Sequence, residues 1–488
     1  MEILYAIFFF CFFAFFIKTK LGNDDLSANL LLFAFSIKSL VGVFFIYYFL
    51  NFGFKPDQPS DVYRFLQESK MLNDIFYKSP LDYFKLLFGF KDYYFMNPAY
   101  FKDAFIWKTG NFSFISDTRN LIRVHSVIQF ISFNNPYIHV LIFNFFTLIG
   151  LKKLTEAFKN HTKIKLPILF LILLFIPSLL FWTSGILKES FILIGIGFIL
   201  NALLSFKDRK KTLINLTIGI TILVFFKTYI LMCLIPSFVF IFIASFFKKH
   251  KIIWSLGIIG LAILSIFSFK PFQNKLTKNI SKKQLDLINV GEGGIHLSDN
   301  KSTYYFTPDN YKNLRLTKNT GILISPSYTY KYDRFKPLEN PKLIFIYPND
   351  QIWNLKIKMP KSNSYFKVTR INDSFKQLIF NIPEALINAF FRPFEFSNQG
   401  LLQKMSFIEM LFIASFILFS FFNKRKLSSS EKLIIASLCI FAFVLLLLIG
   451  WTTPITGSLV RFRFPAQLAL ILVSIIIIKF NNKRIFNE

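Results

Sequence analysis

The chain has 488 residues, of which 53% are hydrophobic and 19% aromatic, and its mean hydropathy is +0.48. This composition is too apolar for a surface that is wetted everywhere, so it excludes an ordinary soluble protein of about three domains. The formal net charge is +30, but 45 of the 57 basic residues are Lys and only 12 are Arg. Lys, Asn, Ile and Phe are jointly abundant, as an AT-biased genome would produce. We therefore expect no nucleic-acid partner and give more weight to the scarce Arg residues.

The cysteines and histidines indicate no metal site. Cys11, Cys233 and Cys439 all lie inside apolar runs, which favours small buried or lipid-facing side chains over a disulfide framework. The five His are dispersed, and no His-x-x-x-His or Cys-x-x-Cys spacing occurs.

Apolar stretches bounded by charge predict an all-α polytopic membrane protein. The first stretch has no preceding basic region and no small-x-small cleavage site, so we interpret it as a retained helix rather than a signal peptide. The sequence predicts eleven spans, near residues 3–17, 28–50, 137–151, 166–181, 187–206, 212–226, 229–247, 252–269, 405–422, 432–450 and 464–480.

Short connections rich in Lys and Arg alternate along the chain and are expected to be cytoplasmic. They cover residues 152–165, 207–211, 248–251, 423–426 and 479–484. The N-terminus and the long connections then lie outside. This predicts a first transmembrane hairpin (1–50), an extracytoplasmic loop (51–136), a transmembrane bundle (137–269), an extracytoplasmic loop domain (270–404) and C-terminal transmembrane helices (405–488).

The two long loops carry different patterns. Mixed apolar and charged spacing over residues 62–120 predicts amphipathic helices in the membrane interface. Short β-favouring runs broken by Pro and Asn over residues 300–370 predict a small β-rich insertion.

The first outer loop opens with two carboxylates, Asp57 and Asp61. A carboxylate beside a membrane surface can take the proton of a sugar hydroxyl while that oxygen attacks an anomeric carbon. The same residues suit a helix start equally well, with Asp57 or Ser60 as N-cap and Asp61 in the first turn.

A second candidate is the tight outer hairpin that runs from Pro177 to Glu189. Lys188 and Glu189 stand at its mouth, where charge is costly unless it is solvated or paired. Lys188 suits a phosphate there, with Glu189 orienting an acceptor. The alternative is a Trp182 anchor with a snorkelling Lys188 paired with Glu189.

Arg461 and Arg463 precede Pro465 at the outer entry of the last predicted span. Because Pro465 biases Phe464 away from helix, we expect both Arg on a segment just outside the helix start. Arg at an outer boundary runs against the positive-inside bias, and a forked guanidinium suits phosphate. Phosphate binding is predicted, with snorkelling anchors as the alternative.

The segment before the ninth predicted span, residues 382–395, has an amphipathic pattern that would bring Arg392 or Glu395 to a lipid headgroup. An interfacial helix that only seals the loop domain is an equal alternative. Lys38 lies within a predicted span and Lys227 at an outer turn, and such residues indicate a polar cavity.

Three of these features together resemble the polytopic bacterial glycosyltransferases of the GT-C superfamily, which includes protein mannosyltransferases and the enzymes that add aminoarabinose or galacturonate to lipid A. They are the acidic stretch Asp57–Asp61 followed by Tyr63, the hairpin Phe181–Glu189, and Arg461–Pro465 at a late span. The three features are spread over most of the predicted membrane-embedded region of the chain.

The resemblance implies a multi-pass glycosyltransferase of the bacterial inner membrane that uses a polyprenyl-phosphate sugar donor and a glycan, lipid or protein acceptor at the extracytoplasmic face. The chain departs from the pattern by an extra span ahead of the acidic loop and by its Asp-x-x-x-Asp spacing, so the identity of the base stays open. Carried over by position, the catalytic candidates are Asp61, Asp57 and Glu189, and the candidates for the donor phosphate are Lys188, Arg461, Arg463 and Arg392.

Other functions remain as alternatives. O-antigen and capsule polymerases or ligases also combine many spans, one big outer loop and essential Arg residues. A flippase or transporter of lipid-linked glycans would have short outer loops and pseudo-symmetric halves, and an assembly protein would bind an envelope partner through residues 270–404. No cofactor is expected to be obligatory, although carboxylates leave room for a divalent cation.

Overall fold

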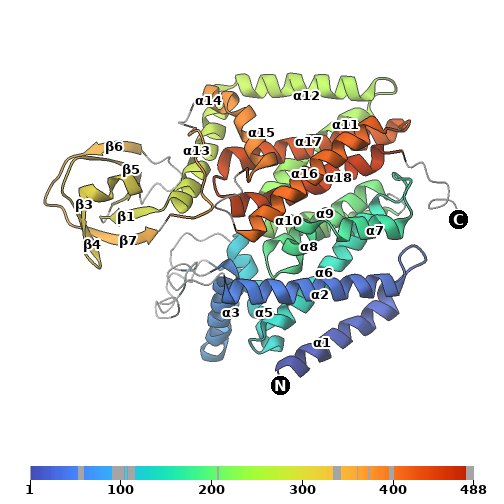
Figure 1. The fold of residues 1–488 in the computed structure, drawn as a ribbon, viewed down its shortest axis with the longest axis horizontal. Coiled ribbons are helices and arrows are strands. Elements are labelled where there is room, and N and C mark those ends of the chain that lie inside the picture. The colour runs from blue at the N-terminus through green and yellow to red at the C-terminus, as the bar shows by residue number, and fades with distance from the viewer. Residues whose placement is uncertain are drawn as a thin grey trace. The chain divides into compact units, whose positions relative to one another are not determined.

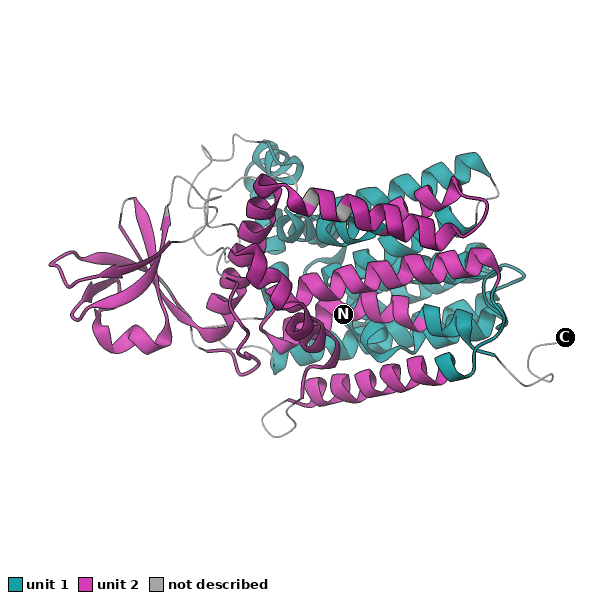
Figure 2. Ribbon diagram, turned by 90° about the horizontal axis from the view of Figure 1, so that it is seen from above, with its two compact units in different colours: residues 1–236, 420–427, 472–488 teal, residues 237–419, 428–471 magenta. Residues whose placement is uncertain are grey.

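The computed structural model describes residues 2–52, 60–90, 100, 104, 107, 116–205, 208–299, 301–333, 342–359, 361–371, 374–394 and 400–479. The chain forms two compact units, coloured separately in Figure 2. Unit 1 comprises Met1–Pro236, Ser420–Leu427 and Leu472–Glu488, and unit 2 comprises Ser237–Phe419 and Ser428–Ile471.

Unit 1 is built of helices (Figure 1). Ser60 and Ser79 begin two of them by accepting hydrogen bonds from the backbone N–H groups of Tyr63 and Asp82. The elements in chain order are α1 (Glu2–Phe16), the π-helical turn η1 (Ile17–Leu21), α2 (Ala28–Asn51), α3 (Asp61–Lys78), α4 (Pro80–Phe88), α5 (Asp117–Ser132), α6 (Pro136–Ala157), α7 (Leu166–Leu174), α8 (Pro177–Ser184), α9 (Lys188–Leu204) and α10 (Arg209–Phe226).

Most of the later helices belong to unit 2, and three of them, α11, α16 and α18, also contribute residues to unit 1. Ser428 and Glu431 form a capping box that begins α17. The helices are α11 (Thr228–Ser245), α12 (Lys251–Ser268), α13 (Lys270–Glu292), α14 (Phe375–Phe380), α15 (Ile382–Phe391), α16 (Leu401–Phe422), α17 (Ser429–Thr452) and α18 (Thr456–Ile477).

A seven-stranded antiparallel sheet lies between α13 and α14 in the chain, with strand order β3-β4-β7-β1-β2-β5-β6. Its buried side chains, among them Ile295, Leu297, Phe306 and Trp353, form a core of their own. The β-rich insertion predicted from residues 300–370 is confirmed. The elements are β1 (Gly294–Ser298), β2 (Ser302–Phe306), the 3-10 turn η4 (Pro308–Asn313), β3 (Leu314–Leu316), β4 (Thr320–Leu323), β5 (Ser327–Asp333), β6 (Lys342–Ile346) and β7 (Trp353–Met359).

Within the described part of the chain, seven helices are long and apolar enough to cross a membrane: Ile3–Leu21, α2, α6, α11, α16, α17 and α18. The pair α7 and α8 would make an eighth, but it is bent by 70°. Pro177 begins α8 and keeps Ile176 extended, with ψ of 116°, so the span predicted at 166–181 is broken there.

Eleven spans are therefore not confirmed. The stretches predicted at 187–206, 212–226 and 252–269 are helical, but they are not among the seven helices that combine the length and apolarity of a span over the described residues. Helix α9 has 17 residues, about 26 Å at the usual rise, against a hydrocarbon core of roughly 30 Å. Helix α10 opens with three basic residues, and the apolar part of α12 covers Lys251–Ala262 among the residues whose side chains the structure describes.

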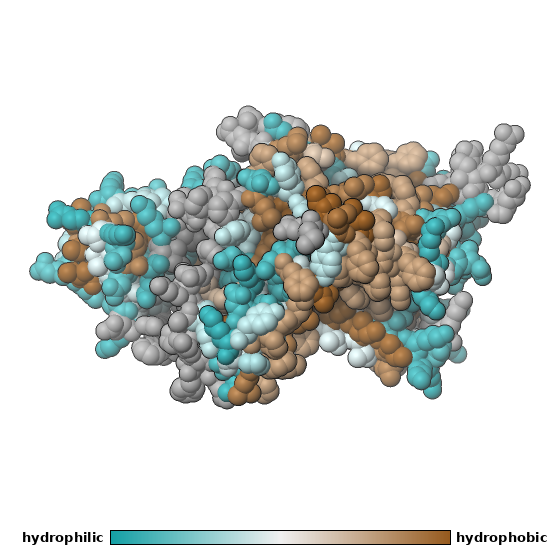
Figure 3. All heavy atoms as spheres, turned by 90° about the horizontal axis from the view of Figure 1, so that it is seen from below, coloured by the Kyte–Doolittle hydropathy of each residue, from teal (hydrophilic) through white to brown (hydrophobic). Residues whose placement is uncertain are grey.

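Many large apolar side chains are exposed on the helices. In α16, Phe412 is 75% exposed and Phe422 is 80% exposed, and α1 exposes Ile3, Leu4 and Phe15 to a similar degree. Figure 3 shows hydrophobic residues gathered over the helical part of the face that it draws. Exposed apolar surface on long apolar helices is typical of contact with lipid, so the chain is a multi-pass membrane protein.

The amphipathic helices predicted over residues 62–120 correspond to α3, α4 and the start of α5. Their apolar faces are buried against the long helices of unit 1. Phe65 and Leu72 of α3 share one core cluster with Leu121 of α5, Phe45 of α2 and Phe143 of α6. This packing holds the loop helices at one end of unit 1, where the polar residues described below lie.

Glycines let α6, α9 and α10 approach one another closely. A Cβ atom on Gly197 of α9 would lie 2.2 Å from the carbonyl oxygen of Gly150 in α6. A Cβ atom on Gly219 of α10 would lie 2.8 Å from the carbonyl oxygen of Gly195 in α9. Small residues at such contacts are the usual means by which membrane helices pack backbone against backbone.

Candidate functional site

Asp117, at the start of α5, contacts two lysines from other helices. Its Oδ2 lies 2.9 Å from Nζ of Lys188, the first residue of α9, and 3.7 Å from Nζ of Lys227, which follows α10. Lys188 Nζ also donates a hydrogen bond to Thr118 Oγ1 at 2.5 Å. The lysine side chains are 8% and 6% exposed, whereas that of Asp117 is 44% exposed. The carboxylate is therefore the member of the trio that faces outward, and the trio carries a net positive charge.

Two opposing effects set the ionisation of Asp117. Burial acts to raise the pKa of its carboxyl, but the charges of Lys188 and Lys227 and hydrogen bonds from Lys188 and Thr118 lower the pKa to about 2. The group is thus ionised throughout the physiological range. A carboxylate with so low a pKa is a poor proton acceptor, so Asp117 is suited to holding the two ammonium groups in place rather than to acting as a general base.

Two arginines continue the positive charge along α5. Arg119 and Arg123 are each 5% exposed, and their guanidinium carbons lie 5.3 and 5.5 Å from the ring centre of Trp107. Arg123 Nε also donates to the carbonyl oxygen of Leu86 at 2.9 Å. We refer to Asp117, Arg119, Arg123, Lys188 and Lys227 as the basic cluster of unit 1.

The first turn of α3 lies beside this cluster. Lys188 Nζ is 6.0 Å from the ring centre of Phe65, which stands one helical turn after Asp61 on the same side of α3. Asp61 itself is exposed, and Ser60 caps the helix, as the helix-start interpretation predicts. The structure thus links Lys188 to α3 through Phe65, one helical turn after Asp61. Asp57 lies outside the described residues.

Glu189 differs from Asp61 in its access to solvent. Its side chain is fully buried, although it is the neighbour of Lys188 at the start of α9. An acceptor that arrives from solution or from the membrane surface reaches exposed atoms first. Among the described acidic candidates, the geometry therefore favours Asp61 as the residue that faces a substrate.

Buried polar contacts fix the turn between α8 and α9 that presents Lys188. Lys38 Nζ donates to Thr183 Oγ1 at 2.9 Å and to Ser184 Oγ at 3.2 Å. His125 Nε2 lies 3.1 Å from the carbonyl oxygen of Ile186 and, since that oxygen only accepts, must carry the proton. Lys38 thus has a structural role in this turn.

The arginine candidates near the C-terminus belong to unit 2. Arg463 is fully buried, and its Nη1 donates to the carbonyl oxygens of Ala389, Phe390 and Arg392, while Nη2 donates to Ser406 Oγ at 2.8 Å. Those carbonyls stand at the carboxyl end of α15, where a helix leaves acceptors unsatisfied. We therefore assign Arg463 a structural role, in which it caps the C-terminal end of α15. It is not available to bind a phosphate.

The prediction that Arg461 and Arg463 precede the helix is wrong. Helix α18 begins at Thr456 and continues through Pro465. Proline lacks an N–H group, so it leaves the carbonyl of Arg461 without its usual helical donor, a loss that membrane helices tolerate where other groups compensate.

Arg392, predicted at a lipid headgroup, directly follows α15. Its guanidinium carbon lies 4.0 Å from the ring centre of Phe366, and its Nε donates to Asn388 Oδ1 at 2.8 Å. Glu395 lies outside the described residues. Arg392, Arg461 and Arg463 thus belong to unit 2, whereas Asp61, Lys188 and Glu189 belong to unit 1.

Replacing Arg463 by Lys tests its structural assignment. Lysine keeps the charge but not the fork that serves three carbonyls and a hydroxyl, so we expect a loss of stability of about 1–3 kcal/mol. The measurement is the thermal unfolding midpoint in detergent. The matched control is Arg209→Lys at the exposed start of α10. Equal midpoints for the two variants would contradict the assignment.

Sequence reasoning missed Asp117, Arg119 and Arg123. The signal was present, because Ser116-Asp-Thr-Arg-Asn-Leu-Ile-Arg123 places two of the twelve Arg residues, four positions apart, after an acid at a helix start. Arg is rare in this chain, and the argument that made Arg461 and Arg463 candidates holds equally for Arg119 and Arg123. Lys227 was noted at its outer turn, but its pairing with Asp117 depends on tertiary structure.

These features define a class: a multi-pass membrane protein with a basic cluster, largely buried, at one end of its spans. Over the residues that the structure describes, no group of three His, Cys, Asp or Glu side chains is placed to hold a metal ion, and the expectation that no cofactor is obligatory stays a prediction. In comparisons with known proteins, no family model, curated protein or solved structure matches the chain.

Proposed function

We propose that the protein is an integral membrane glycosyltransferase that moves a sugar from a polyprenyl-phosphate donor to an acceptor of the cell envelope. The observation that carries this proposal is the contact of Asp117 with Lys188 and Lys227, together with the contact of Lys188 with Phe65 on α3, the helix whose first turn carries the exposed Asp61. It unites a cationic patch and an accessible carboxylate, the two groups that such a transfer needs.

The basic cluster supplies the phosphate site in this proposal. Two ammonium groups offer more hydrogen-bond donors than one carboxylate accepts, and their charge exceeds that of Asp117. Because Lys188 and Lys227 are nearly buried, their attraction for a phosphate is less screened than it would be in water. Asp117 keeps both ammonium groups at one point before the donor arrives, which reduces the reorganisation needed on binding.

The proposed reaction is a direct displacement with inversion at the anomeric carbon. The acceptor hydroxyl oxygen forms a bond to that carbon while the bond from carbon to phosphate oxygen breaks, and polyprenyl phosphate leaves. Asp61 accepts the hydroxyl proton, and Lys188 and Lys227 offset the charge that develops on the leaving phosphate.

The proposed topology matches this chemistry. It retains the eleven predicted spans, with both long loops on the extracytoplasmic side of the bacterial inner membrane. The starts of α5 and α9 and the turn after α10 then fall at the outer ends of their helices. This would bring the basic cluster to headgroup depth, where a lipid carrier holds its phosphate.

Lys188→Met tests the phosphate site, since it removes the ammonium group and keeps most of the side-chain volume. We expect the affinity for polyprenyl phosphate, the product common to donors of this class, to fall roughly 10- to 100-fold. Binding is measured by native mass spectrometry of the full chain in detergent.

Lys70→Met on the exposed side of α3 is the control for Lys188→Met and should bind as the unaltered protein does. Equal affinity in the two variants would remove the basic cluster from the proposal. The lengths of surface glycans after gene deletion separate the alternatives: loss of one substituent indicates a transferase, and collapse to single repeat units indicates a polymerase.

A further inference from the structure

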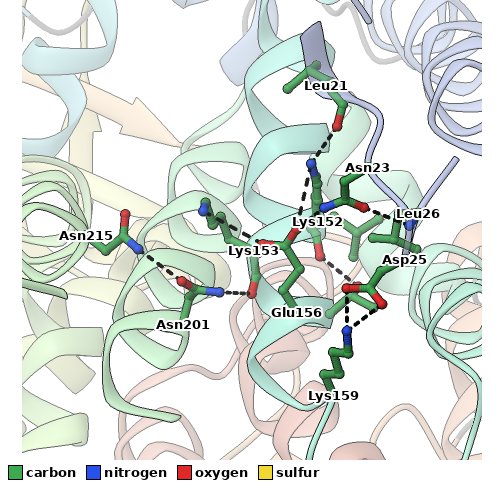
Figure 4. A network of polar contacts seen from close by, with 12 residues as sticks. Leu21, Asn23, Asp25, Leu26, Lys152, Lys153, Glu156, Lys159, Asn201 and Asn215 are labelled. Atoms are coloured by element: carbon green, nitrogen blue, oxygen red, sulfur yellow. Dashed lines mark hydrogen bonds and ion pairs between the residues drawn. The ribbon is translucent and has the colours of Figure 1, made fainter. Parts of the chain in front are cut away.

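A second polar region lies at the opposite end of α9 from Lys188. Figure 4 shows side chains from the carboxyl ends of α6 and α9 and from α10 joined by hydrogen bonds and ion pairs. Asn201 Nδ2 donates to the carbonyl oxygen of Lys153 at 3.1 Å, and Asn215 Nδ2 donates to Asn201 Oδ1 at 3.0 Å. These bonds tie α6, α9 and α10 together where their apolar parts end.

A cavity of about 290 Å³ opens among these helices. A water molecule takes up about 30 Å³ of liquid, so the cavity has room for a polar group much larger than one water. Polar side chains line most of it, including Lys153, Asn201, Ser205, Lys211, Thr212 and Asn215.

The charges in the cavity favour an anion. Lys153 Nζ is 3.7 Å from Glu156 Oε2, a long contact, and the described residues give the Lys211 ammonium no ion pair or hydrogen bond. Asp208 also lines the cavity, but its Oδ1 accepts a hydrogen bond from the backbone N–H of Lys210 as the N-cap of α10. Asn201 and Asn215 supply neutral polar groups.

Exposed apolar side chains continue from the cavity along α10. Ile214 lines the cavity and is 48% exposed, and Ile218, one turn farther along the same face, is 37% exposed. A ligand with a charged head and hydrocarbon tails would therefore meet lysines and hydroxyls at its head and apolar surface beside them. A free phosphate ion would leave that apolar surface unused.

We propose that this cavity binds the phosphate headgroup of an anionic membrane lipid, with its acyl chains along the apolar face of α10 that starts at Ile214. Basic pockets between membrane helices at the end of their apolar stretch are typical sites for such headgroups. In the predicted topology this end is cytoplasmic. The lipid site is separate from the proposed donor site, and it stands whether or not the protein transfers a sugar.

The test is native mass spectrometry of the full chain in detergent with an equimolar mixture of phosphatidylglycerol and phosphatidylcholine. We expect phosphatidylglycerol to be retained preferentially. A double variant, Lys153→Met with Lys211→Met, should lower its apparent affinity roughly tenfold or more, because both cavity ammonium groups are lost. Millimolar inorganic phosphate should displace little of the bound lipid, since the tails contribute to binding.

The control is the double variant Lys163→Met with Lys165→Met, which removes two exposed lysines on the same predicted side of the membrane outside the cavity. It should retain phosphatidylglycerol. An equal loss in both double variants, or binding of inorganic phosphate without lipid preference, would overturn the proposal. Lys188→Met should leave phosphatidylglycerol bound, so failure of the donor site and failure of the lipid site are distinguishable.

Discussion

Asp61→Asn is expected to lower the rate of sugar transfer roughly 10²- to 10⁴-fold, the range typical of a lost general base. Asparagine has nearly the size of aspartate but cannot accept the proton of an attacking hydroxyl. Asp61 is exposed in the first turn of α3, so its replacement should change stability little. The measurement is transfer of a radiolabelled sugar in membranes, with protein abundance determined in parallel.

The control is Asp74→Asn, an exposed acid farther along α3, which should transfer at the normal rate. The pH dependence gives a second check. The folded pKa of Asp117 is depressed to about 2, so its ion pairs contribute fully above the ordinary value of 3.8 and are lost only as pH falls through about 2. A fall in rate between pH 7 and 5 would therefore not come from Asp117. Full activity of Asp61→Asn would remove the proposed base.

Gly197→Leu should destabilise unit 1 more than most single replacements do. Even a Cβ at this position would lie 2.2 Å from a backbone oxygen of α6, and a leucine side chain would force α6 and α9 apart. Overpacking of this kind costs about 1–3 kcal/mol, and more where backbone must move. We expect the thermal unfolding midpoint in detergent to fall by roughly 5 °C or more.

Gly257→Leu is the matched control, because a Cβ on this glycine of α12 meets no other heavy atom within 4 Å. It also replaces a helical glycine by leucine, so differences in helix propensity do not separate the two variants. If both variants unfold at the temperature of the unaltered protein, the close approach of α6 and α9 does not limit stability.

The sequence was sufficient for features that depend on local pattern. Long apolar runs predicted the spans of α2, α6 and α17, and short β-favouring runs predicted the sheet. The mixed spacing after residue 61 predicted the amphipathic α3, whose apolar face is buried. Each of these follows from hydrophobic periodicity over a few turns of chain.

The remaining features depend on contacts between distant segments. Nothing near Asp117 in the sequence shows that Lys188 and Lys227 come to it, since three separate helices supply the trio. Pro465 predicted a helix that starts after Arg463, but α18 continues through Pro465, so tertiary packing outweighs this local preference. Lys188 could be proposed from the sequence because it stands at the mouth of a tight hairpin. The residues next to Arg463 in the sequence do not show that its side chain is buried against the C-terminal end of α15.

The buried Lys38 bears on the order in which the protein is assembled during synthesis. Its hydroxyl partners lie 145 and 146 residues later in the chain, so α2 leaves the ribosome long before α8 exists. A lysine at the centre of an inserting helix costs about 2.5–3.5 kcal/mol on translocon scales. The nascent α2 must therefore tolerate an unsatisfied ammonium group, by snorkelling or by keeping water near it, until α8 arrives. The buried contacts of Lys38 in unit 1 thus form only after α2 has entered the bilayer.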